Sequence, residues 1–217
     1  MVRASLWIMA AALLVCPSLR SSADQASSDP MALMKSIVDQ TLTIISDPSC
    51  KTDQDRCREK LRILVETNWD KAEMARSALG THWREINDQQ REQFTVLFSS
   101  LTEDLYLTTA NLTKAQEKSR GVQVNFIREI SEGDGYMQVN STVALEGEDR
   151  PISVNYRLKL DDGRWMVYDI IVADISLVGN YRNQFNRVIN SKGFPTLINE
   201  LDQKVKQLNA NGTPNPA

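Results

Sequence analysis

The chain contains few of the side chains on which enzymes and metal sites most often depend. Its 217 residues include one histidine, His82, and three cysteines, Cys16, Cys50 and Cys57. A single histidine excludes sites with several histidine ligands and leaves little basis for a Ser-His-Asp triad. The GxGxxG and GxxxxGK(S/T) patterns that hold nucleotide phosphates are also missing. The sequence therefore predicts no catalytic residues, no metal and no cofactor.

Concentrated positive charge and long apolar runs are scarce as well. Acidic residues outnumber basic ones, 28 against 25, and lysine and arginine form no dense run. Binding of nucleic acid and electrostatic docking on anionic lipid both need such a run, so neither is expected. Beyond the N-terminal segment, no stretch is apolar and long enough to span a bilayer.

The first 23 residues have the features of a secretory signal peptide. Arg3 supplies the positive start, residues 4–16 are largely apolar, and residues 21–23 (Ser-Ser-Ala) are small enough for a signal peptidase. We expect cleavage at the end of this segment and export of the mature chain. The alternative is a lipoprotein signal acylated at Cys16, and the bulky Val15 before it argues against this reading.

Removal of the signal leaves 194 residues, with 23 basic and 28 acidic side chains and a net charge of −5. Two cysteines remain, Cys50 and Cys57, which frame a short polar segment. In an oxidising compartment this pair predicts one disulfide that closes a small loop. The alternative is a pair of metal ligands, which would need partners that the distant His82 does not supply.

Four helical patterns come first in the chain. One lies between two Asp-Pro pairs at residues 29–30 and 47–48, and two more are expected over residues 52–68 and 71–79. Asn87 caps the longest helix, in which apolar residues recur at spacings of three and four. The members of this stripe are Phe94, Leu97, Phe98, Leu101, Leu105 and Leu112.

From residue 122 the apolar period changes from 3.6 to two. Strands are predicted over residues 122–126, 137–145, 152–160 and 165–172. Short turns rich in glycine and aspartate separate them, so neighbouring strands should be antiparallel. The pattern predicts a four-stranded antiparallel sheet with one apolar face.

The fourth strand is apolar on both faces. Regular alternation places Val167 and Ile171 on one face and Tyr168 and Ile170 on the other. Both faces must then be covered by other elements. The helix that follows offers an apolar side for this purpose, formed by Val178, Tyr181, Phe185, Val188 and Ile189.

A last helix follows the break at residues 193–195, and the polar tail at 209–217 is expected to be disordered. The order of helices, strands and helices predicts a single α+β domain over residues 24–208.

Asp169 is the one carboxylate that the pattern places within a buried strand. A buried carboxylate needs partners. It could bond to a backbone or basic partner and fix the junction between strand and helix, or act as a general base with a raised pKa in a cavity. By contrast, Asp161 and Asp162 stand in a hairpin turn, which accounts for them fully.

Several segments together resemble the MlaC, or toluene-tolerance, family of periplasmic phospholipid-binding proteins. The strongest is residues 163–171 (GRWMVYDII), followed by 175–178 (ISLV) and 192–197 (KGFPTL). Upstream, residues 78–80 (ALG) and 88–92 (DQQRE) match the pattern that precedes two phenylalanines in the family. The cysteine pair departs from familiar members, and a hopanoid-associated branch of the family is an alternative.

The resemblance implies an NTF2-like roll, in which N- and C-terminal helices cover the sheet and enclose an apolar cavity. It also implies a periplasmic carrier that holds the acyl chains of a diacyl phospholipid. Such a carrier would exchange lipid with an inner-membrane ABC transporter bearing an MCE-domain protein and with an outer-membrane lipoprotein complex, and so maintain the lipid asymmetry of the outer membrane. We expect a monomer.

The residues expected to contact acyl chains come from the long helix, the sheet and the helix after it. They are Phe94, Leu97, Phe98, Leu101, Leu105, Val139, Val154, Tyr156, Leu158, Val167, Ile171, Val178, Tyr181 and Phe185. Walls of a pocket and residues of a filled core have the same periodicity, so the sequence does not separate the two. The alternatives are an NTF2-like enzyme with Asp169 as its base, a carrier of another hydrophobic ligand, and an assembly factor without a cavity.

Overall fold

The computed structural model describes residues 29–109, 121–147 and 149–210. The predicted signal peptide lies outside these ranges, as does most of the predicted tail, although the last helix continues to Ala210. None of the described helices combines the length and the apolar character needed to cross a membrane.

Two helices joined by a disulfide-bonded turn form the N-terminal part. The first, α1, spans Pro30–Ser46, and the Asp29 side chain caps it by accepting hydrogen bonds from two backbone N–H groups. A short 3₁₀ helix, η1 (Pro48–Lys51), leads to α2 (Gln54–Asn68). The predicted disulfide is present, with 5.7 Å between the Cα atoms of Cys50 and Cys57. Both cysteines are buried in a small cluster with Leu61, so the bond ties η1 to the first turn of α2.

Among the described residues, three further helical segments precede the sheet. Helix α3 (Lys71–Leu79) ends at Gly80, whose φ of +58° suits glycine, and η2 (Gly80–Arg84) follows. Helix α4 is described over Asp88–Thr109. Its start is a capping box, because Gln90 N–H donates to Asn87 Oδ1 and Asn87 N–H donates to Gln90 Oε1.

The sheet is antiparallel with the strand order β1-β2-β3-β4-β5. The strands are β1 (Gln123–Gly133), β2 (Tyr136–Ala144), β3 (Ile152–Asp161), β4 (Arg164–Val172) and β5 (Ile175–Ser176). The prediction of four strands is therefore wrong by one. Strand β5 has two residues, which is too short to produce a period of two in the sequence.

A β-bulge in β4 overturns the regular alternation predicted for that strand. Opposite β4, Tyr156 pairs with Ile170, but Leu158 pairs with Val167, so two residues of β4 occupy the space of one. Val167 therefore shares a face with Ile170, and Ile171 turns to the other face. The sequence pattern had grouped Val167 with Ile171, because nothing in it marks the extra residue.

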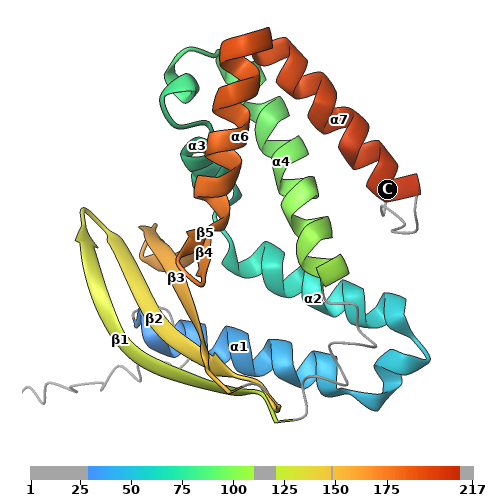
Figure 1. Cartoon of the computed structure of the whole chain (residues 1–217), viewed down its shortest axis with the longest axis vertical. Coiled ribbons are helices and arrows are strands. Elements are labelled where there is room, and N and C mark those ends of the chain that lie inside the picture. The colour runs from blue at the N-terminus through green and yellow to red at the C-terminus, as the bar shows by residue number, and fades with distance from the viewer. Residues whose placement is uncertain (1–28, 110–120, 148, 211–217) are drawn as a thin grey trace, which may run out of the picture.

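Helices α6 (Leu177–Lys192) and α7 (Phe194–Ala210) are the last elements among the described residues. Figure 1 shows the sheet bending around α1, while α3, α4, α6 and α7 gather at the other end of the molecule. Helix α7 packs on α4 and α6, and α1 packs on α2, β1 and β2. The fold is thus α+β, with one helix in the bend of the sheet and a helical layer beside it.

Candidate functional site

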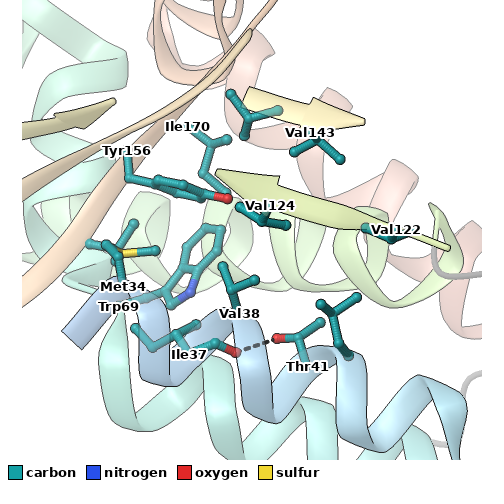
Figure 2. A pocket seen from close by; sticks show the side chains of 13 residues that line it. Met34, Ile37, Val38, Thr41, Trp69, Val122, Val124, Val143, Tyr156 and Ile170 are labelled. Atoms are coloured by element: carbon teal, nitrogen blue, oxygen red, sulfur yellow. Dashed lines mark hydrogen bonds between the residues drawn. The ribbon is translucent and has the colours of Figure 1, made fainter. Parts of the chain in front are cut away.

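An apolar pocket of about 260 Å³ lies between α1 and the inner face of the sheet. Figure 2 shows side chains from both elements pointing toward one another across it. Helix α1 contributes five lining residues, at spacings of three and four that put them on one side of the helix: Met34, Ile37, Val38, Thr41 and Leu42. The hollow is therefore bounded by one whole side of a single helix.

The sheet supplies the opposite wall through cross-strand neighbours. Val124 pairs with Val143, and Tyr156 pairs with Ile170, so each pair presents two side chains to the same face. The bulge adds Val167, and Trp69 at the end of α2 lies alongside it in an isolated bridge. The sheet-side and α2 lining residues are Trp69, Val122, Val124, Val143, Val154, Tyr156, Val167 and Ile170.

Among the residues that the structure describes, the pocket lining includes no Asp, Glu, Lys, Arg or His. Its polar groups are those of Thr41, Trp69 and Tyr156, and the Thr41 hydroxyl donates to the backbone oxygen of Ile37, 2.8 Å away. Such a lining has no side chain suited to general acid–base chemistry near neutral pH. It suits the hydrocarbon part of a ligand, which binds by leaving water.

Helix α1 is fastened near both ends of the pocket. At its start, Met31 N–H donates to Glu129 Oε1 of β1 at 2.7 Å, and the Lys35 ammonium lies over the Phe126 ring. Beyond its C-terminal end, the Cys50–Cys57 disulfide holds the turn that leads to α2. Between these points, the middle of α1 lines the hollow.

Of the residues predicted to contact acyl chains, Val154, Tyr156 and Val167 line the pocket. Most of the others belong to a filled core, where Leu101, Val139, Leu158 and Val178 are buried and Leu97 is partly buried. Ile171 lies off the pocket because of the bulge in β4. Leu105 lies in the part of α4 for which only the backbone is described.

Four of the predicted residues form an aromatic cluster between α4 and α6. Phe94 and Phe98 stack with 5.6 Å between ring centroids, and Phe185 meets both edge-on at 5.5 and 5.4 Å. Tyr181 contacts Phe98 and Phe185 at 5.1 and 5.4 Å. Burial raises the pKa of the Tyr181 hydroxyl. The stripe on α4 is thus packed by the chain itself, and none of these four lines the pocket.

The pocket residues that the prediction omitted come mainly from α1 and from the adjoining parts of β1 and β2. Met34, Val38 and Leu42 form an apolar stripe along α1 that is visible in the sequence. A stripe on any amphipathic helix has the same appearance, so the sequence gives no reason to prefer α1 over α4. For Trp69 there was no periodic signal at all, since it stands between two helices.

Asp169 is buried and directed to the junction with α6. Its carboxylate accepts hydrogen bonds from Ser176 Oγ at 2.6 Å and from Val178 N–H at 3.0 Å, and Arg157 Nη1 lies 3.6 Å away. Ser176 in turn caps α6 by accepting from Gly179 N–H. The side chain therefore fixes the start of α6, and it does not line the pocket.

A network of ion pairs, in which the Asp70 and Glu73 carboxylates are buried, joins α3 to the other face of the sheet. The Lys159 ammonium lies 3.2 Å from Asp70 and 3.7 Å from Glu73, and Arg76 forms two hydrogen bonds to Glu73. Each charge in the group has an opposite partner, which is the condition under which burial of charge is tolerated. Among the described residues, no group of three or more His, Cys, Asp or Glu is arranged to hold a metal.

His82 connects η2 to α6. Its Nδ1 lies 2.6 Å from Glu85 Oε2, and its Nε2 lies 2.9 Å from Asn186 Oδ1. The hydrogen bond with Glu85 raises the pKa of the imidazole. Both ring nitrogens have partners, as expected for a satisfied structural histidine.

Comparison with known proteins supports a single relationship over most of the chain. The family model described as "MlaC protein" matches residues 35–203. An intermembrane phospholipid transport system binding protein MlaC from Haemophilus influenzae is 23% identical over 188 residues, which cover 84% of this chain and 85% of that protein.

A solved structure of a phospholipid-binding protein from Ralstonia solanacearum, in complex with a phospholipid, is 28% identical. The match has a TM-score of 0.69 and covers 83% of this chain and 98% of that one. Since the family model spans more than half of the sequence and the fold agrees, this chain belongs to the MlaC family.

Proposed function

We propose that this protein is a periplasmic carrier that holds a phospholipid by its acyl chains, at an apolar site that includes the pocket between α1 and the sheet. The observation that carries the proposal is the pocket itself, whose described lining residues include no charged side chain. The Ralstonia structure was solved with a phospholipid, and the Haemophilus relative is named for intermembrane phospholipid transport, which supports a lipid as cargo.

The energetics favour a protein that shields the acyl chains. Two chains with roughly thirty methylenes, at about 0.8 kcal/mol each, gain about 24 kcal/mol on leaving water. This exceeds the practical ceiling of about 18–21 kcal/mol for non-covalent binding. A lipid thus crosses water slowly without a carrier, and release from a carrier is the difficult step.

We infer that a membrane-associated partner promotes this release. The proposed partners are an inner-membrane ABC transporter with an MCE-domain protein and an outer-membrane lipoprotein complex, between which a monomeric carrier moves. The name of the Haemophilus relative, a binding protein of a transport system, supports a role beside other components. The energy for net transport would then come from those components.

The position of Asp169 weakens the alternative that this protein is an enzyme with Asp169 as its general base. Asp169 is engaged by Ser176 Oγ and by Val178 N–H, and it lies away from the pocket lining. A general base must reach the proton that it abstracts, directly or through one water. The position of Asp169 therefore favours a carrier over an enzyme that would use this carboxylate.

Native mass spectrometry of the purified mature protein tests the proposal, because bound lipid adds its mass to the protein. A matched pair of variants locates the lipid. Val154 lines the pocket, whereas Val139 is fully buried on the same face of the sheet. Val154→Phe should fill the hollow and reduce lipid occupancy with little loss of stability.

Val139→Phe is the control, because it adds the same volume to a filled core and should cost about 1–3 kcal/mol of stability. Lipid occupancy that is unchanged in a folded Val154→Phe protein would place the lipid elsewhere. Absence of lipid from the wild type under several expression conditions would contradict the carrier itself.

A further inference from the structure

One end of the sheet exposes apolar side chains on the same face that forms the pocket wall. They are Ile152, Val172 and Ile175, with exposed fractions of 37%, 46% and 66%. We name these three residues the lip. Val172 pairs with Ile175 and with Val154, and Ile152 pairs with Val143, so the lip is the direct continuation of the lining.

Exposure increases steadily from the pocket to the lip along two neighbouring strands. On the inner face of β3 it rises from 0% at Leu158 to 9% at Tyr156 and 37% at Ile152. On β4, Val167 is 1% exposed and Val172, beyond Ile170, is 46% exposed. From the pocket toward the lip, the inner face of the sheet therefore becomes more exposed.

The volume of the pocket requires additional apolar surface for a lipid. An apolar cavity of about 150 Å³ accommodates one benzene ring. A pocket of about 260 Å³ therefore receives the end of one acyl chain, and the rest of a diacyl lipid must lie beyond it. The lip is exposed apolar surface that the strand pairing joins to the lining.

The turn that carries the lip is conformationally strained. Ala173 and Asp174 connect β4 to β5 with φ values of +48° and +65°. The turns at Asp134-Gly135 and Asp162-Gly163 also have two positive φ values, but each has glycine at its second position. Strained backbone is often retained where it has a function, and here it holds Val172 and Ile175 side by side.

We propose that the lip is the outer part of the acyl-chain site. Lipid chains enter the pocket across Ile152, Val172 and Ile175, and the portion that the pocket does not hold lies on these residues while the lipid is bound. This inference rests on the proposed carrier function and assigns a role to residues outside the pocket.

A fluorescent probe tests contact between the lip and the acyl chains. In Ile175→Cys, an environment-sensitive dye on the new thiol should show blue-shifted emission in lipid-loaded protein relative to delipidated protein. Ile127→Cys is the control, because Ile127 is an isoleucine of the same sheet with a similar exposed fraction, 58%. A shift of equal size at both positions, or no shift at Ile175, would overturn the proposal.

A second measurement follows extraction of bound lipid by excess cyclodextrin, a soluble acceptor. The double variant Val172→Ser with Ile175→Ser should lose lipid about tenfold faster. The two substitutions remove apolar contact with the lipid equivalent to roughly one buried aliphatic side chain. The matched control is Ile127→Ser with Ile130→Ser, which should release lipid at the wild-type rate.

Equal release rates in both double variants would remove the lip from the site while leaving the carrier function intact. A wild type that carries no lipid would instead overturn the carrier and the lip together, so the two failures are distinguishable. All substituted side chains are exposed, and thermal unfolding confirms that the variants fold.

Discussion

The pocket and the aromatic cluster are both apolar, and they differ in whether side chains fill the space between the elements that form them. In the cluster, Phe94, Phe98 and Phe185 pack ring against ring and are buried. In the pocket, valines and isoleucines of α1 and the sheet face one another across a hollow with a volume of about 260 Å³. Aromatic rings fill the space in the cluster, whereas the residues that line the pocket leave a hollow between them.

The largest expected effect is the difference in lost stability between a substitution in the aromatic cluster and one in the pocket. Phe98→Ala should lower the free energy of unfolding by about 3–5 kcal/mol, because it empties a filled core. Val38→Ala on the pocket side of α1 should cost only about 1 kcal/mol, since part of that side chain already faces the hollow. Chemical denaturation measures both. Equal losses would mean that the two regions are packed alike.

Removal of the disulfide tests whether this bond helps to hold α1 in place as a wall of the pocket. Replacing Cys50 and Cys57 by serine should cost somewhat less than about 3 kcal/mol, because the closed loop is short. It should also speed the exchange of bound lipid, since the turn that anchors α1 to α2 is released. Denaturant midpoints and exchange rates, compared with the oxidised wild type, provide the check. Slower exchange in the serine variant would contradict this role.

Asp169 joins the two regions, because it lies on β4 and holds the start of α6. Asp169→Asn should lower stability by about 1.5–3 kcal/mol, since charge-assisted bonds to Ser176 and Val178 are weakened. Lipid occupancy of the folded variant should equal that of the wild type. If the wild type turned over a substrate in a pH-dependent manner and the folded Asp169→Asn variant did not, the enzyme alternative would be favoured.

The smallest effect concerns the pH dependence of the helical region. Folding raises the pKa of His82 above its unfolded value near 6.5. The protonated ring is therefore favoured in the folded state, and its contribution is complete below about pH 6.5 and is lost as the pH rises through the folded pKa. The contribution should be at most about 1 kcal/mol, because Glu85 is exposed.

Thermal unfolding between pH 5 and 8 measures the contribution of His82 to stability, with Glu85→Gln as the control that removes the charged partner. If stability depends on pH equally in the control, the dependence arises from another group. Lipid occupancy should not follow this pH dependence, because His82 does not line the pocket.

The sequence predicted most of the helices and strands, because these elements have local signals. The two Asp-Pro pairs bound α1, the Asn87 capping box starts α4, and the aspartate-glycine turns set the β-hairpins. The disulfide was predicted from the two cysteines that remain when the expected signal peptide is removed. The family resemblance came from short segments at characteristic spacings, and the matched family model confirms it.

The location of the hollow was decided by the tertiary structure alone. Apolar stripes on α1 and α4 have the same period, and only their packing shows that α4 meets Phe185 while α1 faces a space. The bulge that turns Val167 and Ile170 to one face depends on pairing with β3, and β5 is too short to leave a pattern. Periodicity reports which side of an element avoids water, but whether that side meets another side chain or a cavity depends on residues distant in the chain.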